Sequence, residues 1–167
     1  TFFVVGSRVS TYGDCIRRAV NLGCEIGNHT YNHAILTASS ASVITSEIED
    51  TNRAIKRVTG KGASIVRAPG GSVNSKVRNT VGYPLIGWSV DALDWQHRNT
   101  ARVIASVKSS VKDGSIVLMR VLYSSTGNAA QVIVPWLVKQ GYQLVTVSEM
   151  MQYKGIKPTA GKVYSCA

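Results

Sequence analysis

Two of the three histidines in this 167-residue chain stand four positions apart, in the stretch His29-Thr30-Tyr31-Asn32-His33. Residues at positions i and i+4 lie on the same side of a helical turn. Because neutral imidazole nitrogens bind zinc, such a pair could hold one divalent cation. A polar surface pair or a satisfied core histidine is the commoner origin of this spacing, so residues elsewhere in the chain must decide between the two interpretations.

A second candidate is Arg67, which begins the stretch Arg67-Ala68-Pro69-Gly70-Gly71. Proline fixes the backbone and glycines let a chain pass close to a ligand, so Pro69 and Gly70 suit a binding loop. One interpretation is an ordinary tight turn with an arginine at the surface. In the other, Arg67 points inward and holds a carboxylate through a bidentate pair.

Two aspartates and a tryptophan form the third candidate, Asp91-Ala92-Leu93-Asp94-Trp95. Aspartates at this spacing are most often capping or turn residues. Beside Asp94, however, the indole of Trp95 could pack on a sugar ring, because its apolar face is broad. The stretch therefore predicts either a turn or one wall of a sugar site.

These candidates need elements to position them, and the chain shows strand-like apolar runs alternating with helical patterns. Strands are predicted at residues 1–5, 24–27, 63–66, 84–88, 115–119 and 142–145. Helices are predicted at residues 14–22, 42–58 (capped by Ser42 or Thr45), 74–81, 100–111, 128–140 and 148–153. Such alternation predicts parallel strands joined by right-handed crossovers, in a barrel or an open sheet. No linker or repeat divides the chain, so residues 1–167 are predicted to be a single domain.

The polar candidates each come just after a predicted strand. In parallel α/β folds the carboxyl ends of the strands share one rim, which is where barrel enzymes place their chemistry. The pattern therefore predicts that six side chains converge on a common rim: His29, His33, Arg67, Asp91, Asp94 and Arg120.

The composition describes an ordinary globular protein and excludes several classes. Apolar residues make up 44% of the chain and charged residues 17%, which argues against disorder. No run of 18 apolar residues predicts a membrane span, and the chain opens on a strand-like run with no signal peptide. The net charge is +10, but no basic run or aromatic-basic motif predicts a nucleic-acid partner. Three cysteines without C-x-x-C spacing predict neither a disulfide framework nor a thiolate metal site.

Three of the stretches described above, in their order and separations, resemble a known family. Residues 25–33 (EIGNHTYNH), 67–71 (RAPGG) and 91–95 (DALDW) are similar to three of the five motifs of the polysaccharide deacetylases, the NodB-homology domain of carbohydrate esterase family four. Residues 1–6 resemble the second strand of that family and residues 144–149 its last strand and helix, so the resemblance covers essentially the whole chain. It implies a distorted, incomplete (β/α) barrel that lacks its first strand, in a single domain truncated at its N-terminus.

The resemblance also implies an activity, the removal of N-acetyl or O-acetyl groups from a cell-wall or structural polysaccharide. The family uses a divalent metal, most often Zn²⁺, held by one aspartate and two histidines, which His29 and His33 match. The metal polarises the acetyl carbonyl and activates a water, while a carboxylate and a histidine move the protons.

Further residues take roles only through this resemblance. Arg67 matches the arginine that orients the catalytic base, and Asp94 matches the aspartate that tunes the catalytic histidine. Trp95 and Leu118 match residues lining the acetyl pocket. Pro69 and Gly70 fall in the substrate-binding motif that Arg67 begins.

Two departures from the family pattern predict impaired activity. The paired aspartates of the first motif, which supply the base and the third metal ligand, are missing from this chain. The last motif should read Leu-x-His, but Leu118-Met119-Arg120 stands in its place. Arginine stays protonated at neutral pH and is a poor general acid, although Arg120 could still pair with Asp94. Whether this chain is itself an active enzyme is left open, and the alternative is a degenerate, non-catalytic member that binds glycan.

The expected partner is a polysaccharide, either an N-acetylglucosamine polymer or acetylated xylan. The resemblance implies a secreted or cell-envelope location. An unfilled strand position also leaves open a dimer or strand exchange between two chains.

Overall fold

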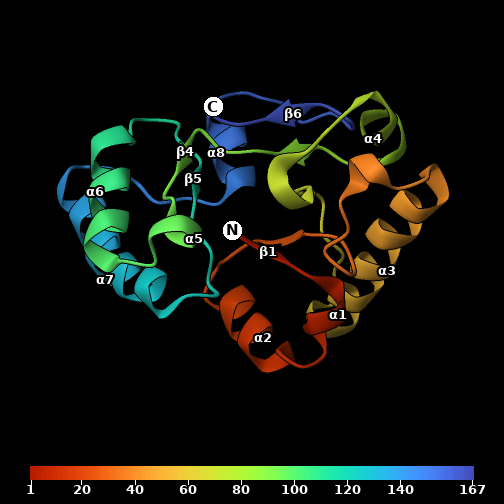
Figure 1. The fold of residues 1–167 in the computed structure, drawn as a ribbon, viewed down its shortest axis with the longest axis horizontal. Helices are drawn as coiled ribbons and strands as arrows, with labels where there is room; N and C mark the ends of the chain where they lie inside the picture. The colour runs from red at the N-terminus through yellow and green to blue at the C-terminus, as the bar shows by residue number, and fades with distance from the viewer. The chain divides into compact units, whose positions relative to one another are not determined.

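A computed structural model describes all residues, 1–167, in two compact units. Unit 1 comprises Thr1–Gly87 and Thr146–Tyr164, and unit 2 comprises Trp88–Val145 and Ser165–Ala167 (Figure 1). That the chain forms a single domain stays a prediction. No helix combines the length and the apolar composition that crossing a membrane requires.

The strands of unit 1 form one parallel ladder. Strand β1 (Phe2–Val4) pairs with β2 (Ile26–Asn28), and β3 (Leu85–Ile86) pairs with β6 (Val163–Tyr164). Bridges from Val66 to Asn28 and to Leu85 join the two pairs. Aromatic and β-branched residues favour strands, and the predicted parallel pairing is confirmed.

Five helices and two single 3₁₀ turns complete unit 1: α1 (Gly6–Val9), α2 (Gly13–Asn21), α3 (Ala41–Thr59), α4 (Ser75–Thr80), α8 (Val147–Tyr153), Leu36–Ala38 and Pro69–Gly71. One core cluster contains Ile44 and Ile48 of α3 together with Leu36, Val66, Val77 and Leu85. A second cluster joins Ile55 of α3 to Val9, Ile16, Ile26 and Ala63. Helix α3 therefore contributes to both cores.

The start of α3 differs from the prediction. Ser40 caps the helix, since its hydroxyl accepts a hydrogen bond from the amide of Val43, so the predicted caps Ser42 and Thr45 are wrong. Ser40 has the extended backbone that an N-cap requires, whereas Ser42 and Thr45 already lie inside the helix. At the other end, Gly60 adopts a left-handed conformation and ends α3.

In unit 2, strands β4 (Val90–Asp91) and β5 (Val117–Leu118) pair in parallel. Its helices are α5 (Asp94–His97), α6 (Thr100–Ser110) and α7 (Ser124–Lys139). Helices α6 and α7 lie side by side in Figure 1, and their buried residues form one core cluster, containing Val103, Val107, Ala129, Ile133 and Leu137. The helices predicted at 100–111 and 128–140 are thus confirmed, although α7 begins at Ser124.

The strand predicted at residues 142–145 is wrong. That segment forms no strand pairing, and Leu144 is 48% exposed, so it has no ladder to join. Instead, the chain adds β6 some twenty residues later, where the amide of Leu85 donates to the carbonyl of Lys162. The strand predicted at 63–66 is reduced to a bridge at Val66.

Helix α8, predicted at 148–153, begins with a capping box. The amide of Thr146 donates to Glu149 Oε2 over 2.7 Å, and the hydroxyl of Thr146 accepts from the amide of Glu149. The backbone hydrogen bond from Thr146, followed by its side chain, lowers the pKa of Glu149. Because the folded pKa is the lower one, this stabilisation is present above the ordinary glutamate pKa and is lost as the pH falls through the lowered value.

Candidate functional site

The predicted histidine pair is brought together by a loop that follows β2. The ring centroids of His29 and His33 are 4.9 Å apart, with the two planes at 71°. The predicted helical turn is wrong, because Thr30 and His33 have φ values of +64° and +59°. Two left-handed residues, and not a helix, place the two imidazoles side by side.

The protonation of His29 follows from one hydrogen bond. Nδ1 of His29 lies 2.7 Å from the carbonyl oxygen of Arg67. A carbonyl only accepts, so Nδ1 must carry the proton and the lone pair of a neutral ring remains on Nε2. Metal-binding histidines commonly donate their other nitrogen to a carbonyl in this way, which fixes the ring.

The residues present fit part of a metal site. Two imidazoles with their rings in contact could supply two ligands to a divalent cation. No group of three or more histidine, cysteine, aspartate or glutamate side chains is arranged to hold a metal. The histidine pair therefore fits two coordination positions, and the zinc site stays a prediction.

Arg67 is buried beside this loop, with only 9% of its surface exposed. Its Nε donates to the carbonyl of Ile86 over 3.1 Å, and its Nη2 donates to the carbonyl of Gly87 over 2.9 Å. The guanidinium carbon lies 4.2 Å from the centre of the Phe3 ring. Arg67 thus connects three parts of unit 1 around His29, and its expected pairing with a carboxylate stays a prediction.

The turn after Arg67 is as tight as the sequence predicts. Pro69 is buried, while Gly70 is exposed with φ of +65° inside a 3₁₀ turn. A glycine suits this conformation because it has no Cβ. Their role in binding substrate stays a prediction.

In unit 2, Asp94 is fully buried and receives four hydrogen bonds. Its Oδ1 accepts from Arg120 Nη1 at 2.7 Å and from the amide of Trp95 at 3.0 Å. Its Oδ2 accepts from the amide of Arg120 at 2.5 Å and from the hydroxyl of Thr126 at 2.9 Å. The ion pair that the sequence predicts between Arg120 and Asp94 is present.

The neighbouring residues of unit 2 surround this pair. Asp91 Oδ1 accepts from the amide of Leu93 at 2.9 Å and lies 3.4 Å from Arg120 Nη1. This Asx-type bond accompanies the left-handed conformation of Leu93, with φ of +53°. Trp95 is half-exposed, whereas Leu118 is buried, so only the indole offers a broad face to a ligand.

Each unit therefore gathers one part of the predicted site. Unit 1 brings His29, His33 and Arg67 together, and unit 2 brings Asp91, Asp94 and Arg120 together. That both groups share one rim stays a prediction.

Two functional neighbours were missed by sequence reasoning. Thr126 donates to Asp94, and its position in α7 gave no signal. Glu47 accepts from the loop between the two histidines. A signal for Glu47 did exist, because it lies three positions after Ile44 and so falls on the face of α3 that the isoleucines bury.

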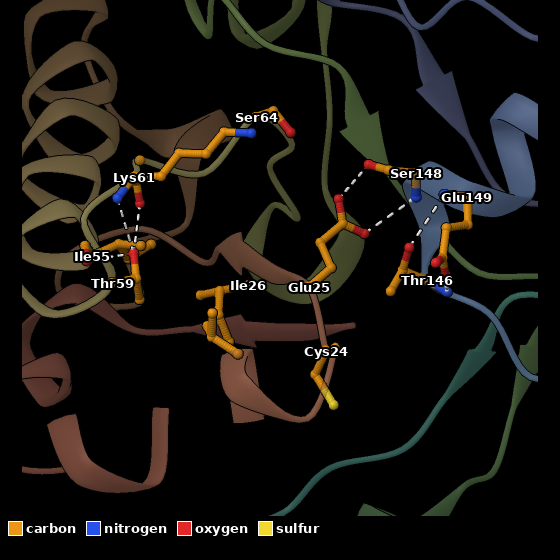
Figure 2. A pocket seen from close by; sticks show the side chains of 13 residues that line it. Cys24, Glu25, Ile26, Ile55, Thr59, Lys61, Ser64, Thr146, Ser148 and Glu149 are labelled. Atoms are coloured by element: carbon orange, nitrogen blue, oxygen red, sulfur yellow. Dashed lines mark hydrogen bonds between the residues drawn. The ribbon is translucent and has the colours of Figure 1, made fainter. Parts of the chain in front are cut away.

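A hollow of about 350 Å³ lies elsewhere in unit 1. Its lining includes Cys24 and Glu25, which precede β2, and Ser64, which precedes the bridge at Val66. Lys61 and Ser148 also line it (Figure 2). The carboxylate of Glu25 accepts from the amide of Ser148 at 3.2 Å and from its hydroxyl. None of the predicted site residues lines this hollow, so it is separate from the histidine loop.

Gly6 gives a first test of how tightly the loop is packed. A Cβ at Gly6 would lie 2.5 Å from Tyr31 Cδ2 and 2.6 Å from Thr51 Oγ1. We expect Gly6→Ala to lower the free energy of unfolding by about 1–3 kcal/mol, as overpacking does. Gly13→Ala is the control, since its nearest contact would be an ordinary 3.5 Å. Equal urea-unfolding midpoints for the two variants would contradict the close approach.

Comparison with known proteins gives a consistent set of relatives. A profile described as "Polysaccharide deacetylase" matches residues 1–83. A peptidoglycan-N-acetylglucosamine deacetylase from Bacillus cereus is 35% identical over 162 residues, covering 92% of this chain and 76% of that protein. The peptidoglycan-N-acetylmuramic acid deacetylase PdaC from Bacillus subtilis is 36% identical over 92% of this chain. The chain spans only 33% of PdaC, about a third of its length.

Solved structures agree with these relatives. A deacetylase termed T48, solved with substrate, has a TM-score of 0.93 and 34% identity, covering 98% of this chain and 81% of that one. A family-four pseudoenzyme from Bacillus anthracis has a TM-score of 0.82 and 28% identity, covering 90% of this chain and 54% of that one.

Proposed function

We propose, from the premise that this chain belongs to the polysaccharide deacetylase family, that it removes acetyl groups from a cell-wall polysaccharide. A divalent metal, most often Zn²⁺ in such sites, would bind at His29 and His33. Peptidoglycan is the first candidate substrate, because the relatives from Bacillus cereus and Bacillus subtilis are peptidoglycan deacetylases. Acetylated xylan is the second, because a bifunctional xylanase/deacetylase is 37% identical to this chain. We therefore propose a location outside the cell or at its envelope, where such substrates lie.

The observation that carries the proposal is the hydrogen bond from His29 Nδ1 to the carbonyl of Arg67. It leaves the lone pair of a neutral ring on Nε2 and restricts rotation of the ring, so His29 would bind a metal through Nε2. The ring of His33 contacts that of His29, so the second ligand stands beside the first.

The chain's own residues would divide the remaining work. When bound, a divalent metal polarises the acetyl carbonyl and lowers the pKa of a bound water. The side chain of Arg67 donates to two carbonyls at the end of β3. Its own carbonyl accepts a hydrogen bond from the ring of His29 and so orients that ring. Trp95 offers a half-exposed indole on which a sugar ring could pack.

Proton transfer is the weak step of this proposal. Arg120 stands where the family has its catalytic histidine, and a guanidinium does not release its proton near neutral pH. Its Nη1 is also held by Asp94. Losing one well-placed proton-transfer group costs roughly 10²–10⁴-fold in rate. The carboxylate base of the family's first motif is also missing from these 167 residues, so we propose slow catalysis by this chain.

The same ion pair favours a second candidate, a non-catalytic member that binds glycan. Arg120 and Asp94 satisfy each other, which gives a stable scaffold but no acid. A pseudoenzyme among the structural relatives supports this alternative. Binding to insoluble peptidoglycan that withstands a chelator and is lost in Trp95→Ala would favour binding over catalysis.

Acetate release tests the proposed activity. The purified chain, supplied with excess Zn²⁺, should release acetate slowly from N-acetylated peptidoglycan fragments, in a reaction that a chelator stops. The chelator-treated chain is the control, and acetylated xylan distinguishes the second substrate class. No acetate from either substrate, with zinc in excess, would exclude catalysis by this chain and leave the glycan-binding function.

A further inference from the structure

The loop between the two histidines depends on a carboxylate from another element. Glu47, in α3, is only 7% exposed although it is charged. Its Oε2 accepts from the amides of Tyr31 at 2.7 Å and Asn32 at 2.8 Å. Its Oε1 accepts from Nδ2 of Asn32 at 2.9 Å. All three donors belong to the two residues immediately before His33.

Three other backbone groups of this loop are also held. The amide of Thr30 donates to Asn28 Oδ1 at 2.9 Å. The carbonyls of Thr30 and Tyr31 accept from the amides of Gly6 and Ser7, each at 2.9 Å. The loop is thus fixed through its carbonyls by the start of α1 and through its amides by Glu47.

This double attachment matters because the loop has an unusual backbone. Thr30 and His33 both adopt φ values near +60°, which non-glycine residues rarely do. Such conformations persist only where the surroundings determine them. Without the Glu47 carboxylate, the amides of Tyr31 and Asn32 would lose their partner, and the left-handed turn that presents His33 would lose its support.

We infer that Glu47 is a positioning residue for the histidine pair, holding the loop in the conformation in which both imidazoles can bind one cation. This inference rests on the proposed function and assigns it a residue outside the matched motifs. It requires a carboxylate in particular. A neutral glutamine accepts these hydrogen bonds more weakly than a carboxylate, and its amide nitrogen would face Nδ2 of Asn32 unless that side chain turned over.

The test compares Glu47→Gln with Glu49→Gln in the metal-free chain. Glu49 is the matched control, since it lies on the same helix and accepts from the hydroxyl of Tyr83 at 3.3 Å, away from the loop. In Glu47→Gln, hydrogen exchange of the Tyr31 and Asn32 amides should accelerate at least ~10-fold, and the ring resonances of His33 should shift. Glu49→Gln should change neither. Unchanged amide exchange or unchanged His33 resonances in Glu47→Gln would overturn the inference.

Zinc affinity gives the second readout, independent of activity. Glu47→Gln should raise the Kd for Zn²⁺ by roughly 10–100-fold, the usual effect of losing an outer-shell partner. In a His33→Ala background the same change should have no further effect, because its action runs through that ring. An equal loss of affinity in both backgrounds, or none in either while the unmodified chain binds zinc, would overturn positioning. If the unmodified chain binds no zinc, the proposed function fails, and the metal-free resonances still decide the inference.

Asn32→Asp covers the case in which Glu47→Gln does not fold. It places a carboxylate at an exposed position where Asn32 Nδ2 lies 2.9 Å from Glu47 Oε1. Repulsion between the two carboxylates should disturb the loop without removing any buried apolar side chain. The same His33 shift, in a chain with unchanged far-UV circular dichroism, is expected. An unshifted His33 resonance in Asn32→Asp would contradict the inference that Glu47 positions His33.

Discussion

Replacing Arg120 by methionine should lower the free energy of unfolding by about 3 kcal/mol, because it leaves the charge of Asp94 without its counter-ion. Asp94 is completely buried, and Arg120 Nη1 lies 2.7 Å from its Oδ1. The amides of Trp95 and of residue 120 and the hydroxyl of Thr126 would remain as donors, but none of them carries a charge. Urea unfolding followed by circular dichroism measures the change.

Two variants separate this ion pair from a general effect of losing an arginine. Arg102→Met removes an exposed arginine from α6 and should change stability by less than about 0.5 kcal/mol. The double variant Asp94→Asn with Arg120→Met should recover part of the loss, since no uncompensated charge stays buried. If Arg120→Met is no less stable than Arg102→Met, the pair does not stabilise the fold.

The fold class is the part of the structure that the sequence predicted best. The mixed α/β fold of the NodB-type deacetylases is confirmed by solved structures with TM-scores up to 0.93. Residues such as Ile44, Ile48 and Ile55 predicted α3 because their spacing needs no knowledge of distant partners. The strand prediction at residues 142–145 was wrong because a strand forms only where a neighbouring backbone can pair with it. Strand β6 was missed for the same reason, since its pairing with β3 is not visible in its own residues.

The site was predictable in its residue types and less so in its geometry. The histidine spacing pointed to a pair, but the left-handed conformations of Thr30 and His33 bring the rings together, and no local pattern announced them. Glu47 was missed because its carboxylate accepts hydrogen bonds from amides sixteen and fifteen positions earlier in the chain. Long-range hydrogen bonds of this kind leave only an indirect sign in the sequence, here a charged residue on the buried face of a helix.

Replacing either histidine of the pair by alanine should raise the Kd for Zn²⁺ by more than ~100-fold, which corresponds to at least about 2.7 kcal/mol of binding free energy. Only two imidazoles are in place, and no third protein ligand joins them, so each supplies about half of the site. Isothermal titration calorimetry of the metal-free chain with Zn²⁺ measures the loss of affinity. His29→Ala should also free the carbonyl of Arg67, whereas His33→Ala should not, so the two variants differ in stability but not in affinity.

His97→Ala is the matched control for this prediction, because His97 is the one remaining histidine and lies in α5 of unit 2. Its Kd for Zn²⁺ should equal that of the unmodified chain. A loss of affinity in His97→Ala as large as in His33→Ala would mean that zinc binds histidines without regard to the loop. The contact between the two rings would then have no functional meaning, and glycan binding without a metal would become the better account of this chain.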